Sequence, residues 1–542
     1  MIQLMVARMA ARTPNLLGVR MPRVTSVIAM HGKFRRNEVA VRFPDPKGSS
    51  APVEVTYGQF VQEMDTIASN VQQGYRRARI ATLLTNDSPR TLTTMLGCVR
   101  GGACLVPLNA TLKANQIEGM LKDCDAKVVI ASERYSSLIA DSVPGIRRVG
   151  FDFSNGKWES FGSMLSGSSR PVDQDDGPLG MEDEFNVIYS SGTTGLPKGI
   201  VQTHANRLHW AWSNAITMRF QHDSRALTTT ALYSNGTFLI TLPTLFVGAT
   251  LNVMKQFDPV QALEIIQREK ITHVFMVPTQ LKMCVDAGAS RYDLSSLRMV
   301  LSAGSTLSSE LKKRVLREIT PNLFELYGNS EGFASMLFPE EHATKFNTVG
   351  RPLLGNDLKI VETEGNQELP RPGEVGEICV RGPGMMLSYN DRPEETMKDI
   401  WEDPTTGLKY FRSGDVGKVD KDGYLSLMER KKDMIISGGF NVFPKDIEEI
   451  MLEHPDIHDV AVVAASHEKW GETPVAIVIP RADSRLVAED VQKWTNERVS
   501  KVQRLSYVKV LRHDEGFPRN VLGKVMKKEL RERLKEWGMP RM

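Results

Sequence analysis

The chain has 542 residues, a formal net charge of +3, 41% hydrophobic residues and 25% charged residues. Its length predicts more than one domain, and its composition is that of a globular protein. The nearly balanced charge gives no electrostatic support for a nucleic-acid partner. The five cysteines lack the spacing of zinc sites and of disulfide frameworks, which indicates a reducing compartment.

The N-terminal segment, residues 1–37, contains several arginines and no acidic side chain, a bias that organellar transit peptides share. It lacks the long apolar stretch of a secretory signal. We therefore expect a short basic extension, residues 1–24, on a cytoplasmic protein. A mitochondrial protein is the alternative.

Strands and helices alternate along the chain, which predicts an α/β architecture with a largely parallel sheet. A helix is expected at 204–219, and short strands separated by Gly and Pro at 355–390 indicate a β-rich subdomain. The apolar runs predicted to be strands are 38–43, 53–57, 79–84, 102–109, 127–131, 185–189, 249–253, 273–277, 297–305 and 321–328.

One uncharged stretch runs between Arg225 and Lys255. Its threonines, its two glycines and Pro243 make it a poor membrane helix, because polar groups and helix breakers are costly in a bilayer. We expect instead a buried helix that lines an apolar pocket, and no integral membrane segment.

The pattern changes near Arg430. A hairpin-like strand at 423–428 precedes this residue, and a compact unit of mixed helices and strands follows it. We therefore predict a large domain at 25–430 and a small α+β domain at 431–542.

A glycine-rich segment follows the strand predicted at 185–189. Residues 189–200 read Tyr-Ser-Ser-Gly-Thr-Thr-Gly-Leu-Pro-Lys-Gly-Ile. Glycines let several backbone N–H groups turn toward one point, where hydroxyls and a lysine would cradle an anion. The spacing is not that of a Walker A loop, because Lys198 is followed by Gly199. A flexible polar surface loop is the alternative.

Three further motifs follow in order. Residues 325–331 read Glu-Leu-Tyr-Gly-Asn-Ser-Glu, residues 411–415 read Phe-Arg-Ser-Gly-Asp, and residues 518–524 read Pro-Arg-Asn-Val-Leu-Gly-Lys. Taken singly, they would be a turn at a strand end, a surface salt bridge and the start of a charged helix.

Together the four motifs resemble those of the adenylate-forming superfamily, which includes acyl- and aryl-CoA synthetases, luciferases and the adenylation domains of peptide synthetases. The resemblance extends from about residue 25 to residue 530. It implies a large N-terminal domain and a small, mobile C-terminal domain. It also implies a reaction in two steps, in which a carboxylic acid and ATP form an acyl-AMP and a second group then displaces AMP.

The resemblance also implies roles for individual residues. Tyr327 would stack on adenine, Ser330 would contact the α-phosphate, and Asp415 would accept hydrogen bonds from the ribose hydroxyls. Glu331 and Thr193 would hold Mg²⁺. The ATP-binding set implied in this way is Ser190, Ser191, Gly192, Thr193, Thr194, Gly195, Lys198, Tyr327, Gly328, Ser330, Asp415 and Arg430.

Lys524 and Glu331 would be the catalytic residues. A lysine ammonium can neutralise the attacking carboxylate and the α-phosphate oxygens as charge moves between them. The lysine loop departs from the commoner form because Val521 and Leu522 replace two small residues. Lys432 falls at the hinge position about which the C-terminal domain of the superfamily rotates.

Coenzyme A is the favoured acceptor of the acyl group. Ser437, Gly438 and Gly439 resemble the loop through which CoA synthetases admit pantetheine, and Trp470 falls in a segment that resembles a CoA-facing region. No carrier domain is expected after Met542. The alternatives are a ligase that passes the acyl group to a separate carrier protein, and a nucleotide-binding homologue without activity.

The candidate acid pocket consists of Tyr233, Ser234, Ala303, Gly304 and Met336, with core packing as the alternative role. Ser234 stands where many CoA synthetases carry a histidine. Residues 224–257 contain neither Asp nor Glu, which disfavours an amino acid because its ammonium would need an acidic partner. An apolar acid, aliphatic, aromatic or polycyclic, is therefore expected. Homodimer formation is left open.

Overall fold

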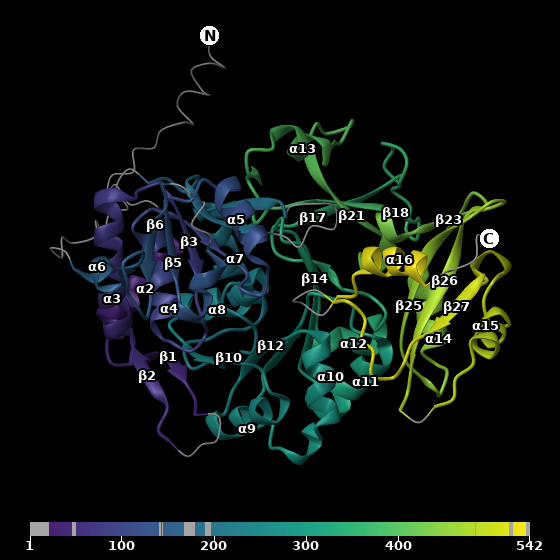
Figure 1. Cartoon of the computed structure of the whole chain (residues 1–542), viewed down its shortest axis with the longest axis horizontal. Coiled ribbons are helices and arrows are strands. Elements are labelled where there is room, and N and C mark those ends of the chain that lie inside the picture. The colour runs from purple at the N-terminus through teal and green to yellow at the C-terminus, as the bar shows by residue number, and fades with distance from the viewer. Residues whose placement is uncertain are drawn as a thin grey trace, which may run out of the picture.

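The computed structural model describes residues 21–45, 50–139, 143, 145–166, 179–189, 197–482, 484–519 and 524–537. These residues form four β-sheets (Figure 1). The C-terminal part, yellow in Figure 1, builds the last sheet beside the larger N-terminal part. The predicted α/β architecture, with a β-rich subdomain and a smaller α+β unit, is confirmed.

Two sheets with parallel central strands make up most of the N-terminal part. Every residue of strands such as β5 and β12 is buried, as expected for parallel strands covered on both faces. In sheet order, the first contains β16 (Arg351–Pro352), β15 (Ala334–Leu337), β14 (Leu323–Gly328), β13 (Met299–Ser302), β12 (His273–Met276), β10 (Arg225–Thr228), β11 (Thr250–Val253), β1 (Val39–Phe43) and β2 (Val53–Thr56). The second contains β19 (Ser388–Tyr389), β9 (Gly199–Thr203), β8 (Glu184–Tyr189), β4 (Cys104–Pro107), β3 (Arg79–Leu83), β5 (Val128–Ala131), β6 (Arg147–Gly150) and β7 (Glu159–Ser160).

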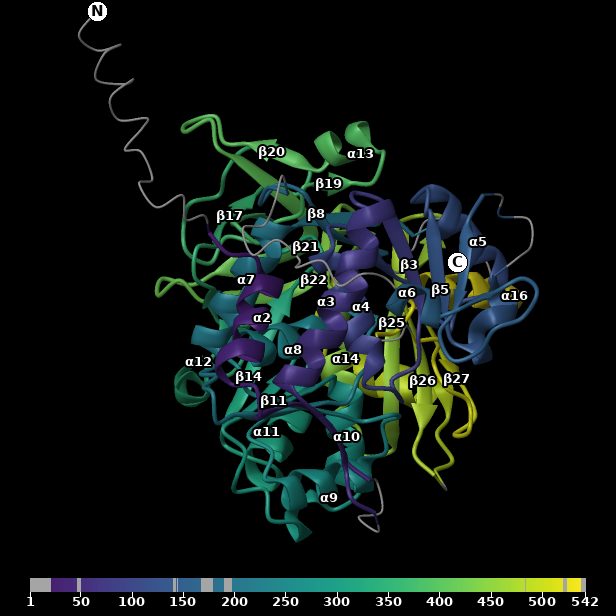
Figure 2. The same ribbon diagram turned by 90° about the vertical axis from the view of Figure 1, so that its left-hand side faces the viewer.

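Helices lie between these two sheets and on their outer faces. The middle layer shares one hydrophobic cluster with both sheets and contains α2 (Val24–Phe34), α3 (Tyr57–Gly74), α4 (Arg90–Arg100), α7 (His204–Thr217) and α8 (Phe238–Phe246). Helices α3 and α4 pack side by side within it (Figure 2). The first sheet is covered outside by α9 (Pro259–Glu269), α10 (Pro278–Asp286) and α11 (Ser309–Glu318), and the second by α5 (Ala114–Asp123).

Two local predictions take a more definite form. The strand predicted at 53–57 ends at Thr56, because the Thr56 hydroxyl and Gln59 form a capping box that begins α3 at Tyr57. The uncharged stretch holds the buried helix α8, which has only nine residues between two strands. Among the described helices, none combines the length and hydropathy that a membrane span requires.

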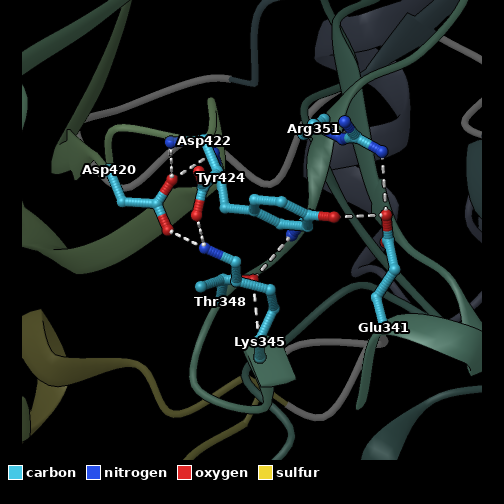
Figure 3. A network of polar contacts seen from close by, with 8 residues as sticks. Glu341, Lys345, Thr348, Arg351, Asp420, Asp422 and Tyr424 are labelled. Atoms are coloured by element: carbon cyan, nitrogen blue, oxygen red, sulfur yellow. Dashed lines mark hydrogen bonds and ion pairs between the residues drawn. The ribbon is translucent and has the colours of Figure 1, made fainter. Parts of the chain in front are cut away.

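The β-rich subdomain continues well beyond residue 390. Its sheet contains β17 (Asp357–Val361), β18 (Gly376–Arg381), β21 (Lys409–Val419), β20 (Ile400–Glu402) and β22 (Leu425–Arg430). Lys345 Nζ lies 2.7 Å from Asp420 Oδ2 and 2.5 Å from Asp422 Oδ2 on the β21–β22 hairpin (Figure 3). Tyr424 of the same hairpin donates to Glu341 over 2.7 Å (Figure 3). These contacts fasten the hairpin to the segment between β15 and β16 and so position the motif residues on β21 and β22.

The C-terminal sheet has hydrophobic clusters on both faces. One cluster includes α14 (Pro444–Met451) and α15 (Ala488–Asn496), and the other includes α16 (Lys527–Glu536). Its strands are β24 (Phe440–Val442), β23 (Ile435–Ser437), β26 (Gly471–Pro480), β25 (Ile457–His467) and β27 (Tyr507–Val510). This unit therefore has a core of its own, as expected for a separate domain.

Candidate active site

A cavity of about 700 Å³ lies between the N-terminal part and the C-terminal unit. Its floor is formed at the carboxyl ends of parallel strands: Phe275 belongs to β12, Gly304 follows β13, and Gly328 ends β14. Carboxyl ends of strands in open α/β sheets are the usual location of ligands. Lys432 and Lys524 line the cavity from the other side.

Asp415 and Arg430 face each other as partners in the β21–β22 pairing. Arg430 Nε lies 2.6 Å from Asp415 Oδ1, and the Tyr327 hydroxyl donates to Asp415 Oδ2 over 2.6 Å. Burial, with the negative charge of Asp415, holds the pKa of Tyr327 well above its usual value, so the tyrosine stays a donor. Each carboxylate oxygen has a second lone pair and could still accept a ribose hydroxyl.

Glu331 projects from the turn after β14 and lines the cavity with Ser330. The Tyr389 hydroxyl donates to Glu331 Oε1 over 3.0 Å. The adjacent Gly332 has a φ of +120°, and a Cβ there would lie 1.9 Å from the Gly384 carbonyl oxygen, so only glycine fits this turn.

The surroundings of Glu331 fit a divalent cation that binds together with phosphates. Burial raises the pKa of this carboxyl, and this effect outweighs the hydrogen bond from Tyr389 and the positive charge of Arg430, which lower it. No cluster of three or more acidic, His or Cys side chains that could hold a metal ion by itself occurs in the described ranges. Mg²⁺ is commonly held by one or two carboxylates plus substrate phosphates, so a single well-placed glutamate suffices.

The glycine-rich segment, residues 189–200, is described only at its two ends. Ser190, Ser191, Gly192, Thr193, Thr194 and Gly195 lie outside the described residues. Lys198 Nζ is 2.8 Å from Glu395 and 4.4 Å from the centre of the Tyr389 ring. Tyr389, a residue that the motifs did not indicate, therefore contacts both Lys198 and Glu331.

Lys524 lies in the same cavity as Ser330 and Glu331. Burial, with the positive charge of Arg430, lowers the pKa of Lys524 to about 8. Burial also lowers the pKa of Lys432, the predicted hinge residue, which lines the cavity as well. The C-terminal unit is thus docked with Lys524 on the same cavity as Ser330, Glu331 and Arg430.

Contacts between the two parts hold this arrangement. Lys527 Nζ of α16 lies 3.3 Å from Glu429 of β22 and 2.9 Å from Glu448 of α14. Within the C-terminal unit itself, Arg531 of the same helix lies 2.9 Å from Asp433. An ammonium that bridges carboxylates of both parts fixes their relative position.

The predicted CoA-binding residues lie together but outside the cavity. Ser437 ends β23, and Gly438 and Gly439 form its turn with φ values of +57° and +82°. The Gly438 N–H donates to the Trp470 carbonyl over 2.8 Å. Trp470 is 44% exposed, and Phe440, which directly follows Gly439, is 61% exposed. The loop therefore presents aromatic surface to solvent in this arrangement.

The acid side of the cavity includes four of the five predicted pocket residues, which are Tyr233, Ser234, Ala303 and Gly304. Met336 is fully buried in the central hydrophobic cluster and does not line the cavity. Its position is that of a core-packing residue, which is the alternative role. The sequence reasoning missed much of the wall, which also contains His209, Trp210, Ser213, Asn214, Asn235, Leu239, Phe275, Leu353 and Asn356. The residues from α7 recur at helical spacing, which could have indicated them.

A two-part fold with these motifs around one cavity defines an adenylate-forming ligase. The AMP-binding enzyme family matches residues 31–390, and the AMP-binding enzyme C-terminal domain matches residues 446–539. The chain belongs to this family. It is an AMP-forming acyl-CoA synthetase, an acid–thiol ligase that uses ATP and CoA.

Named relatives are similar over nearly their whole length. An indoleacetate–CoA ligase of Aromatoleum aromaticum is 34% identical over 517 residues, which are 93% of this chain and 97% of the relative. A feruloyl-CoA synthase of an Amycolatopsis species is 31% identical over 88% of this chain and 94% of its own. ATP-bound MatB from Rhodopseudomonas palustris has the same fold, with a TM-score of 0.82, 24% identity, and coverage of 95% of this chain and 100% of that one.

Proposed function

We propose that this synthetase activates an apolar aromatic or arylalkyl carboxylic acid, with Mg²⁺ at Glu331, and transfers it to CoA. The observation that carries the proposal is the acid side of the cavity, where Trp210, Leu239 and Phe275 supply large apolar surfaces. The acidic residues of the cavity wall among the described residues, Glu331 and Asp433, belong to the nucleotide side. Relatives named for indoleacetate, ferulate and 4-coumarate support an aromatic acid.

In the proposed first step, a carboxylate oxygen attacks the α-phosphorus of ATP, and pyrophosphate leaves. Asp415 orients the ribose, Ser330 contacts the α-phosphate, and Lys524 lies where its ammonium neutralises charge on both reacting groups. Mg²⁺ bound with the phosphates at Glu331 would stabilise the charge of the leaving pyrophosphate. The glycine-rich segment would hold the β- and γ-phosphates.

In the proposed second step, the thiolate of CoA attacks the acyl carbonyl, and AMP leaves. Because the loop at Gly438 lies outside the cavity, the C-terminal domain, residues 431–542, must first move relative to residues 25–430. We place the swivel at Lys432, between the two units. This movement breaks the contact between Lys527 and Glu429, which join the two parts over 3.3 Å.

A panel of acids tests the proposal. Wild-type protein with ATP, Mg²⁺ and CoA is given indole-3-acetate, ferulate, phenylacetate, octanoate and malonate, and pyrophosphate and thioester are both measured. We expect the aromatic acids to give the highest rates and malonate the lowest. Preference for octanoate or malonate would contradict the proposed acid class. Adenylate without thioester, but with transfer to a carrier protein, would favour the alternative acceptor.

A further inference from the structure

Arg207 is a fully buried cation without a carboxylate partner in the described ranges. Its Nε donates to Asn186 Oδ1 over 2.7 Å, and its Nη2 donates to Asn235 Oδ1 over 2.8 Å. The guanidinium also lies 4.7 Å from the ring centre of Trp210. Nη1 has no hydrogen-bond partner among the described residues. Burial lowers the pKa of Arg207 to about 9. A buried cation in such surroundings favours an anion nearby.

This cation lies behind the wall of the cavity, at the junction of its two sides. Asn235 and Trp210, which contact the guanidinium, both line the acid side. On the other side, Asn186 pairs with Gln202 in the β8–β9 ladder, and Gln202 Nε2 donates to the Ser330 carbonyl over 3.1 Å. The reacting carboxylate must occupy this junction, because it has to reach the α-phosphate from the acid side.

The hydrogen bond from Arg207 also fixes the orientation of the Asn235 amide group, and so determines which of its atoms faces the cavity. A guanidinium has five N–H donors and no acceptor, so Asn235 must direct its oxygen toward Arg207. The amide nitrogen of Asn235, with two N–H donors, is then left for the cavity. Ser234 beside it adds a hydroxyl to the same wall. A carboxylate, which only accepts hydrogen bonds, is complementary to such a wall.

We propose that Asn235 binds the carboxylate of the acid substrate through its amide nitrogen, and that Arg207 is the positioning residue that orients this amide and supplies the compensating positive charge. Asn235 and Arg207 would position the carboxylate in this chain, in which Ser234 stands where many CoA synthetases carry a histidine. The inference rests on the proposed function, because it takes a carboxylic acid as the occupant of the acid side.

The test uses Asn235→Asp, which is close to isosteric. An aspartate can pair with Arg207 and should keep the fold intact, with an unchanged or higher melting temperature. It places a negative charge against the substrate carboxylate and removes the donors. We expect KM for the best acid of the panel to rise about 100-fold, while KM for ATP changes less than threefold. Thioester formation from supplied acyl-AMP should fall much less than adenylation, because the acyl group of that substrate carries a neutral carbonyl instead of a carboxylate.

Binding of an uncharged analogue separates this role from a purely structural one. Wild type should bind indole-3-acetate more tightly than indole-3-acetamide in calorimetry with an ATP analogue present. Asn235→Asp should reverse this order, because its carboxylate accepts from the amide N–H groups and repels the acid. If Asn235→Asp does not fold, Asn235→Leu serves, and it should bind the two compounds equally.

An acid KM within threefold of wild type, or an unchanged order of binding, would overturn the inference. Failure of the proposed function is a different result: wild type would release no pyrophosphate with aromatic acids. In that case the order of binding would still decide whether Asn235 recognises a carboxylate.

Discussion

The nucleotide side and the acid side of the cavity are built in different ways. On the nucleotide side, polar groups from separate short segments contact one another: Asp415 contacts both Arg430 and Tyr327 at 2.6 Å. The acid side combines large apolar side chains with neutral polar ones, has no acidic residue among those described, and is assembled from α7, α8 and three strand ends. Its buried cation, Arg207, has amide partners rather than a carboxylate. The residues that handle charge, which any acid substrate requires, therefore come from recognisable motifs. The residues that select the acid form the pocket wall through tertiary packing.

The largest effect expected is that of Lys524→Ala. Removing the ammonium leaves the charge of the transition state uncompensated, so adenylation should slow about 1,000-fold. Transfer from supplied acyl-AMP to CoA should change less than threefold, because Lys524 acts only in the first step. Pyrophosphate exchange and thioester formation measure the two steps. Equal losses in both would place the lysine outside this role.

Asp415→Ala should act on the nucleotide side alone. It removes the acceptor for the ribose and leaves Arg430 unpaired, so KM for ATP should rise about 100-fold with little change in KM for the acid. Asp420→Ala is the matched control, since this aspartate lies on the same β-hairpin but pairs with Lys345 (Figure 3). A control with the same loss of ATP affinity would show that the effect is structural.

Leu239→Ala should act on the acid side alone. The lost methyl groups line the cavity, and KM for the acid should rise about tenfold while KM for ATP stays constant. Leu242→Ala on the same helix is the control, because Leu242 is 1% exposed in the core and does not line the cavity. It should lower the melting temperature and leave both KM values near those of wild type. A change in KM for ATP with Leu239→Ala would contradict the claim that the two sides of the cavity act independently.

The smallest effect expected is the pH dependence of adenylation. Since burial lowers the pKa of Lys524 to about 8, its ammonium is present below that pH and is lost as pH rises through it. The rate should therefore fall above pH about 8, by up to tenfold per pH unit. Lys524→Arg, which stays charged, should be slower but without this alkaline fall. The same fall in both proteins would assign it to another group.

The two sides also differ in how far the sequence predicts them. Asp415 and Arg430 were both identified, because the motif residues lie close together along the chain and meet in one hairpin. Tyr389 was missed, since it reaches Glu331 from a distant strand. On the acid side, Met336 is predicted as a pocket residue with core packing as the alternative, and the structure buries it fully in the core.

The contacts of Arg207 show why a residue that is buried only by tertiary packing cannot be identified from the sequence. In the sequence, Arg207 is one polar residue of a predicted helix, with nothing to distinguish it from a surface arginine. Its burial follows from α7 lying between two sheets, and its partners come from β8 and from the segment before α8. The strands themselves were predictable, because buried parallel strands are continuous apolar runs.

The central claim is that the carboxylate of the acid attacks the α-phosphorus of ATP at the junction of the two sides. It is tested most directly with phenylacetate or indole-3-acetate labelled with ¹⁸O in both carboxyl oxygens, followed by mass spectrometry of the products. One labelled oxygen should appear in AMP, the other should remain in the thioester, and pyrophosphate should carry no label. Label in pyrophosphate, or AMP without label, would contradict this account.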